Sequence, residues 1–149
     1  MRKINISILL GLLLILTSFN SLNPSQYRLK TVVIDAGHGG KDPGARGKIS
    51  WEKDIALAIS LELGRILKEN MPAINVVYTR KDDRFLTLYK RSEIANKSNA
   101  DLFISIHADS FSKSSVYGAT TYLMGLSKTS ANMNVAKREN SVIFLEENY

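Results

Sequence analysis

The sequence contains no cysteine among its 149 residues. This absence excludes a disulfide framework, a zinc site built from thiolates and a cysteine nucleophile. Histidine is almost as scarce, since the chain holds only His38 and His107. Any site that needs imidazole must therefore use one or both of two residues that lie far apart in the sequence.

The excess of positive charge is also small. The formal net charge is +6, and two of the positive charges, Arg2 and Lys3, lie in an N-terminal segment that we expect to be removed. The other basic residues are spread along the chain, with no aromatic stacking motif between them. We therefore expect no nucleic-acid partner.

Long hydrophobic runs are missing as well. The apolar stretch from Ile8 to Leu16 is shorter than the roughly 20 residues of a membrane-spanning helix. Basic residues precede it and a Ser/Asn/Pro stretch follows, which is the order typical of a secretory signal. We interpret residues 1–22 as a signal peptide or N-terminal anchor, 23–30 as a linker and 31–149 as the folded domain. We expect export to the periplasm or cell envelope, with membrane contact only through an uncleaved N-terminal segment.

Apolar patterning in the remaining chain alternates between strand and helix periods. The predicted strands are 31–35, 74–80, 101–109 and a more exposed 118–125, and the predicted helices are 51–69, 87–98 and 128–147. Ser50 and Thr87 are the expected N-caps of the first two helices. The long apolar run at 101–109 predicts a central strand. This alternation predicts an α/β fold with a twisted, mainly parallel sheet and helices on both faces.

One glycine-rich segment, "TVVIDAGHGGKDPGARG" at residues 31–47, joins the first strand to the first helix. Such loops often bind phosphate, but Asp42 stands where the dinucleotide motif needs its third glycine. The same residue stands where a phosphate-binding loop needs Ser or Thr. A carboxylate would repel phosphate there, so the segment is not a nucleotide loop.

A metal site accounts for both the glycines and the histidine. His38 follows the first predicted strand and His107 lies near the end of the third, so both are expected at the carboxyl edge of one sheet. Two histidines and one carboxylate can hold zinc and leave a fourth position for water. The carboxylates near His38 are Asp35, Asp42 and Glu52. Each residue alone is unremarkable in sequence, and their coincidence at one edge favours a metal centre.

Four segments in order, from Val32 to Met124, resemble the zinc-dependent N-acetylmuramoyl-L-alanine amidases of bacterial cell walls. They are "VVIDAGHGGKDPGARG", "EKDIALAIS", "VVYTRKDDRFLTLYKRSEIAN" and "ADLFISIHADS", which include the DAGHGG loop and the SIHA strand end of that family. The resemblance implies a six-stranded twisted sheet and a zinc ion (Zn2+) held by His38, Glu52 and His107.

The same resemblance implies hydrolysis of the amide between the lactyl group of N-acetylmuramic acid and L-alanine in peptidoglycan. Such cleavage serves cell-wall turnover or daughter-cell separation. Peptidoglycan would be the substrate and an activator protein a further partner. Arg80 and Arg91 also match the family pattern, and we expect them to brace the loop rather than contact substrate. Asp109 is expected to orient a ligand histidine.

The resemblance also implies a glutamate on a late strand as general base, and no such strand precedes Tyr149. The late acids Glu139, Glu146 and Glu147 are expected on a solvated helix face. No catalytic base is therefore assigned, and the domain is expected to be C-terminally incomplete, with an unpaired sheet edge. Two alternatives stay open: a zinc-stabilised peptidoglycan-binding or regulatory module without turnover, and a different zinc hydrolase such as a deacetylase.

Overall fold

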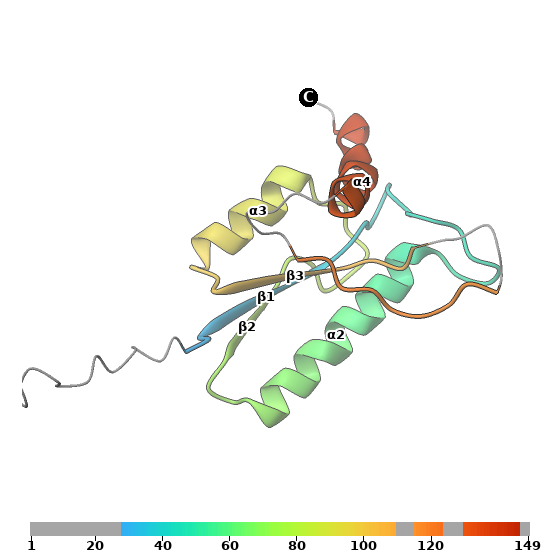
Figure 1. Cartoon of the computed structure of the whole chain (residues 1–149). Helices are drawn as coiled ribbons and strands as arrows, with labels where there is room; N and C mark the ends of the chain where they lie inside the picture. Colours follow the sequence, from blue (N-terminus) through green and yellow to red (C-terminus); the bar gives the residue numbers. More distant parts are fainter. Residues whose placement is uncertain (1–27, 110–114, 124–129, 147–149) are drawn as a thin grey trace, which may run out of the picture.

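The computed structural model describes residues 28–109, 115–123 and 130–146 (Figure 1). The predicted signal or anchor at 1–22 and most of the predicted linker lie outside these ranges. Within the described residues, no helix has the length and apolar character needed to cross a membrane.

The described sheet has three strands, β1 (Thr31–Ala36), β2 (Asn75–Tyr78) and β3 (Leu102–Ile106). Their order is β2-β1-β3, and both pairs are parallel, which confirms the predicted α/β class.

The expectation that the third strand is central was wrong for the described sheet, since β1 holds that place. From Val32 to Ala36 every β1 residue is buried, whereas Leu102 and Phe103 of β3 are each 42% exposed. An apolar run indicates that the faces of a strand are covered, but it does not identify the strands beside it.

Among the described residues, three α-helices and one 3-10 helix accompany the sheet. They are α2 (Glu52–Asn70), α3 (Leu88–Lys97), α4 (Ser130–Glu139) and η1 (Asn140–Leu145). Thr87 caps α3 as predicted, because its side chain accepts a hydrogen bond from Lys90 N at 3.1 Å. Trp51, and not Ser50, is the N-cap of α2, and Ser50 O instead accepts the N–H of Gly47 in the preceding loop.

The last two predicted elements differ from the structure. Residues 118–123 of the predicted strand 118–125 are irregular and exposed, and the rest of it lies outside the described residues. Strand propensity alone is insufficient there, because a strand needs a neighbour to complete its hydrogen bonds. The predicted helix 128–147 is divided between α4 and η1.

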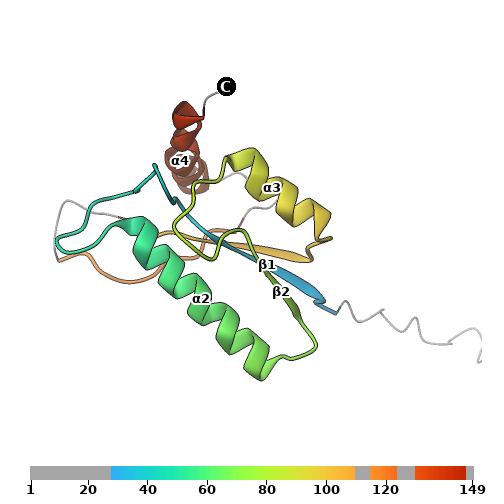
Figure 2. The ribbon, with the colours of Figure 1, turned by 180° about the vertical axis from the view of Figure 1, so that it is seen from behind.

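Helices cover both faces of the sheet (Figures 1 and 2), with α2 on one side and α3 and α4 on the other. The strand order explains this arrangement. The chain moves from β1 to β2 in one direction and from β2 past β1 to β3 in the other, so right-handed crossovers lie on opposite faces. On the α2 side, Val32 and Ile34 pack with Leu63 and Leu67 of the helix.

A site is expected where the connections from two adjacent strands diverge, beyond their carboxyl ends. Here those strands are β1 and β3, which pair from Val32–Leu102 to Ala36–Ile106. Gly37 N continues the pairing by donating to Ile106 O at 2.9 Å. The segments that carry His38 and His107 therefore leave the sheet side by side.

Candidate metal centre

The loop after β1 turns sharply at His38. Its φ is +59°, and Gly39 and Gly40 follow with φ of +129° and +56°. A left-handed backbone costs a non-glycine residue about 1–2 kcal/mol, so the neighbouring contacts must hold His38 in this conformation.

Two buried arginines bind the backbone of that loop. Arg80 donates to Ala36 O at 2.9 Å and to Gly37 O at 2.7 Å. Arg91 of α3 donates to Ala36 O at 2.7 Å and to His38 O at 2.8 Å. Because these guanidinium groups bind successive carbonyl oxygens of the loop, they constrain its path.

Asp35, one of the candidate carboxylates, belongs to this support and not to the histidine cluster. It points to the face covered by α3, where it pairs with Arg91 at 2.7 Å. The hydroxyls of Thr79 and Ser105 donate to it at 2.7 and 2.8 Å. The carboxylate is thus fully engaged beneath the loop.

Glu52 is the candidate carboxylate that faces both histidines. It opens α2, and its Oε2 accepts the N–H of Ala45 at 2.9 Å while its Oε1 accepts the N–H of Ala108 at 2.9 Å. Oε1 also lies 3.2 Å from His38 Nε2 and 3.2 Å from His107 Nδ1. Two backbone donors from separate segments therefore fix this carboxylate between the two imidazoles.

The imidazoles themselves meet edge to face, with ring centroids 4.8 Å apart and an interplanar angle of 81°. His107 Nδ1 lies 3.2 Å from His38 Nε2. The structure thus brings together the three residues that the resemblance implies as zinc ligands.

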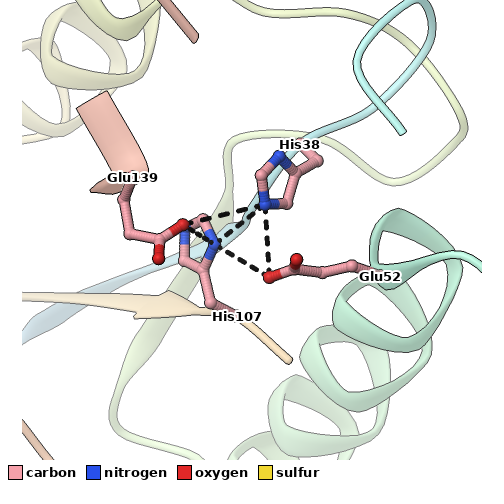
Figure 3. A group of neighbouring side chains, drawn as sticks. All are labelled: His38, Glu52, His107 and Glu139. Atoms are coloured by element: carbon pink, nitrogen blue, oxygen red, sulfur yellow. Dashed lines mark hydrogen bonds and ion pairs between the residues drawn. The ribbon is translucent and has the colours of Figure 1, made fainter. Parts of the chain in front are cut away.

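A fourth member of the cluster, Glu139 at the end of α4, was not expected (Figure 3). Its Oε2 lies 2.9 Å from His107 Nδ1 and 3.8 Å from His38 Nε2, and its side chain is only 17% exposed. The expectation of a solvated helix face was therefore wrong for Glu139. No local pattern in the sequence marked this burial, because it depends on where α4 packs.

Glu146 and Asp109 also differ from expectation, whereas the expectation for Glu147 is not tested. Glu146 accepts the N–H of Leu88 at 2.7 Å, at the start of α3, and Glu147 lies outside the described residues. Asp109, expected to orient a histidine, instead pairs with Arg138. Both members of that pair line a cavity of about 340 Å³ beside the cluster, together with His38, Glu52 and Glu139.

The charges in this cluster reinforce one another. Burial lowers the pKa of His38, but its hydrogen bonds to Asp42 and Glu52 outweigh that effect and raise the pKa to about 9. Burial likewise lowers the pKa of His107, and contacts with Glu139 and Glu52 raise it to about 9. Burial raises the pKa of Glu52, yet the two histidines and two backbone N–H groups hold it far below its usual value. The cluster therefore pairs ionised carboxylates with imidazoles that readily take up protons.

The arrangement fits a four-coordinate cation. Zinc bonds of about 2.0–2.1 Å in a tetrahedron place neighbouring ligand atoms about 3.3 Å apart. The five separations among the four groups given above lie between 2.9 and 3.8 Å, and all four ligand atoms fall within 4.8 Å of one another. Two imidazole nitrogens and two carboxylate oxygens are a donor set that zinc accepts. His38, Glu52, His107 and Glu139 could hold such an ion.

Comparisons with known proteins point to one family. The model of the N-acetylmuramoyl-L-alanine amidase family matches residues 32–144. The chain is 44% identical over 109 residues to AmiA of Escherichia coli, an N-acetylmuramoyl-L-alanine amidase, covering 72% of this chain and 36% of AmiA. It is 50% identical over 93 residues to the uncharacterised YqiI of Bacillus subtilis, covering 62% of this chain and 44% of YqiI.

Among solved structures, the catalytic domain of the amidase CwlV from Paenibacillus polymyxa superposes with a TM-score of 0.55 at 48% identity. The match covers 59% of this chain and 50% of that domain. The chain therefore spans half or less of the length of these relatives. Since the family model covers most of the described fold and the whole histidine–glutamate cluster, the chain belongs to the N-acetylmuramoyl-L-alanine amidase family.

Proposed function

We propose that this protein is a zinc-dependent hydrolase that cleaves the amide between N-acetylmuramic acid and L-alanine in peptidoglycan. The observation that carries the proposal is the convergence of two imidazole nitrogens and two carboxylate oxygens beyond the carboxyl ends of β1 and β3. The family membership supports the same substrate and bond.

The proposed reaction needs a Lewis acid to activate the amide carbonyl, because an amide carbonyl reacts slowly with water. A bound zinc ion supplies Lewis acidity that polarises a carbonyl and makes water more acidic. His38, Glu52 and His107 would hold that ion, and the fixed hydrogen bonds of Glu52 to Ala45 and Ala108 keep this ligand in place without substrate. The cavity beside the cluster gives access from solvent.

Glu139 determines whether the site is open. Its Oε2 lies 2.9 Å from His107 Nδ1 and 3.8 Å from His38 Nε2, close to the separation of two atoms that bind the same zinc ion. Glu139 thus takes the fourth position of a tetrahedral site. Catalytic zinc sites keep that position for water or substrate, so hydrolysis requires Glu139 to yield it. The four-donor arrangement specifically favours the second candidate function, a zinc-stabilised peptidoglycan-binding or regulatory module without turnover.

Release of stem peptide from purified peptidoglycan tests the first function. The zinc-loaded full chain should release peptides that begin with L-alanine, and Glu139→Ala should release them at least as fast. His107→Ala, which loses a ligand, is the inactive control. Peptide mass separates this reaction from deacetylation, which would release acetate instead.

Two results would redirect the proposal. If zinc-loaded wild type and Glu139→Ala both co-sediment with peptidoglycan but release nothing, the binding module is the better description. If Glu139→Gln keeps its zinc but loses all turnover, Glu139 is a general base and not a removable fourth donor.

We further propose export to the cell envelope, where the substrate lies, and dependence on an activator protein. Each is tested directly, by fractionation of the host and by comparing purified with cell-wall-associated activity.

A further inference from the structure

Asp42 is a buried carboxylate beside the cluster but not part of it. Its Oδ2 lies 2.8 Å from Nδ1 of His38, on the side of the ring opposite the nitrogen that faces Glu52 and His107. The residue is only 7% exposed. It therefore touches the ring of a candidate ligand without reaching the position of the ion.

The loop delivers Asp42 to that position by a closed turn. Gly39 N donates to Asp42 O at 2.8 Å, and Asp42 N donates to Gly39 O at 3.1 Å. This pair of hydrogen bonds brings Asp42 back to the imidazole ring of His38. The left-handed φ of His38 and of the two glycines after it makes the turn tight enough for this return.

The consequence concerns which imidazole nitrogen is free. A carboxylate on Nδ1 accepts its proton and leaves the lone pair of Nε2 pointing at the cluster. Such outer contacts orient ligand histidines and raise their basicity. We propose that Asp42 is a positioning residue that fixes the tautomer and orientation of His38 so that Nε2 faces the metal position. This inference rests on the metal site of the proposed function, but not on turnover.

A purely structural role for Asp42 makes a different prediction. Its Oδ1 accepts the N–H of Gly44 at 3.2 Å, so the side chain also braces the loop. Asp83 provides the matched comparison. Its carboxylate accepts the N–H of Gly40 at 2.7 Å and pairs with Lys53 at 2.6 Å, holding the same loop without touching His38.

The first experiment measures zinc affinity of the full chain by competition with a chromophoric chelator. Asp42→Ala should bind zinc about 10–100-fold more weakly than wild type. Asp42→Asn should lose less, because its amide oxygen still accepts the Nδ1 proton. Asp83→Ala should stay close to wild type. An Asp42→Ala affinity within about twofold of wild type, or an equal loss in Asp83→Ala, would overturn the proposal.

The second experiment reads the proton directly by long-range 1H–15N correlation of the imidazoles. In zinc-loaded wild type and Asp42→Asn, His38 should carry its proton on Nδ1, and Asp42→Ala should lose this preference. A proton on Nε2 in wild type would refute the proposal. The same spectrum of metal-free protein at about pH 10, where the ring is neutral, tests the tautomer without zinc. If wild type fails to bind zinc, the proposed function fails while this arm still decides the role of Asp42.

Discussion

His107 lies directly over the backbone of Gly37. A Cβ built on Gly37 would stand 2.4 Å from Cε1 and 2.6 Å from Nε2 of the imidazole. The ring reaches the cluster only because the first residue after β1 has no side chain. Gly44 plays the same part for His38, since a Cβ there would lie 2.6 Å from the ring and 2.9 Å from Cβ of Glu52.

We therefore predict that Gly37→Ala displaces His107 and weakens zinc binding by at least about tenfold, because ligand geometry tolerates little displacement. The measurement is zinc affinity with folding checked by circular dichroism. Gly47→Ala is the matched control in the same loop, where the new Cβ would meet its nearest atom, Ser50 O, at 3.0 Å. Equal affinities for Gly37→Ala and wild type would contradict the steric role.

Metal-free protein should lose stability as the pH rises. The folded-state pKa of His38 and of His107 is raised from 6.5 to about 9, so their protonation stabilises the fold fully below pH 6.5. That contribution falls away as the pH rises through about 9. Thermal unfolding in the presence of a chelator should show Tm decreasing from pH 6.5 to pH 9. An unchanged or rising Tm would show that the imidazoles are not held by the carboxylates.

Zinc binding should release protons, because a metal can bind only deprotonated imidazole. With both histidines protonated near neutral pH, about two protons should leave for each zinc bound at pH 7.5. Calorimetry in buffers of different ionisation enthalpy measures this number. His107→Ala should reduce proton release, and a value near zero in wild type would contradict the raised pKa values.

The buried pair of Asp35 and Arg91 should matter for the fold and the loop alike. Arg91→Met leaves the Asp35 carboxylate buried without its charge partner, and breaking such a pair costs about 3–5 kcal/mol. Urea unfolding measures this loss. Arg65→Ala, which removes an exposed pair with Glu62 and Glu69 on α2, should cost much less. A similar cost for both variants would show that the buried pair of Asp35 and Arg91 stabilises the fold no more than an exposed pair does.

Local patterns in the sequence were sufficient for the first part of the fold. Apolar periodicity located β1 to β3, α2 and α3, and Thr87 was recognisable as a cap, because these features depend on residues close together in the chain. The rule that strand ends carry the ligand site then placed His38 and His107 at one edge. Glu52 was a candidate from its position at a helix start.

Only the tertiary structure decided which carboxylates do what. Asp35, Asp42 and Glu52 all lie near His38 in sequence. In the structure, however, Asp35 faces α3, Asp42 contacts Nδ1 of His38, and Glu52 contacts Nε2 of the same ring. Strand order was also beyond the sequence, because pairing depends on the path of the connections. Glu139 reaches His107 from 32 positions further along the chain. Nothing local distinguishes such a buried carboxylate from a solvated one, since its burial depends on where the whole helix packs.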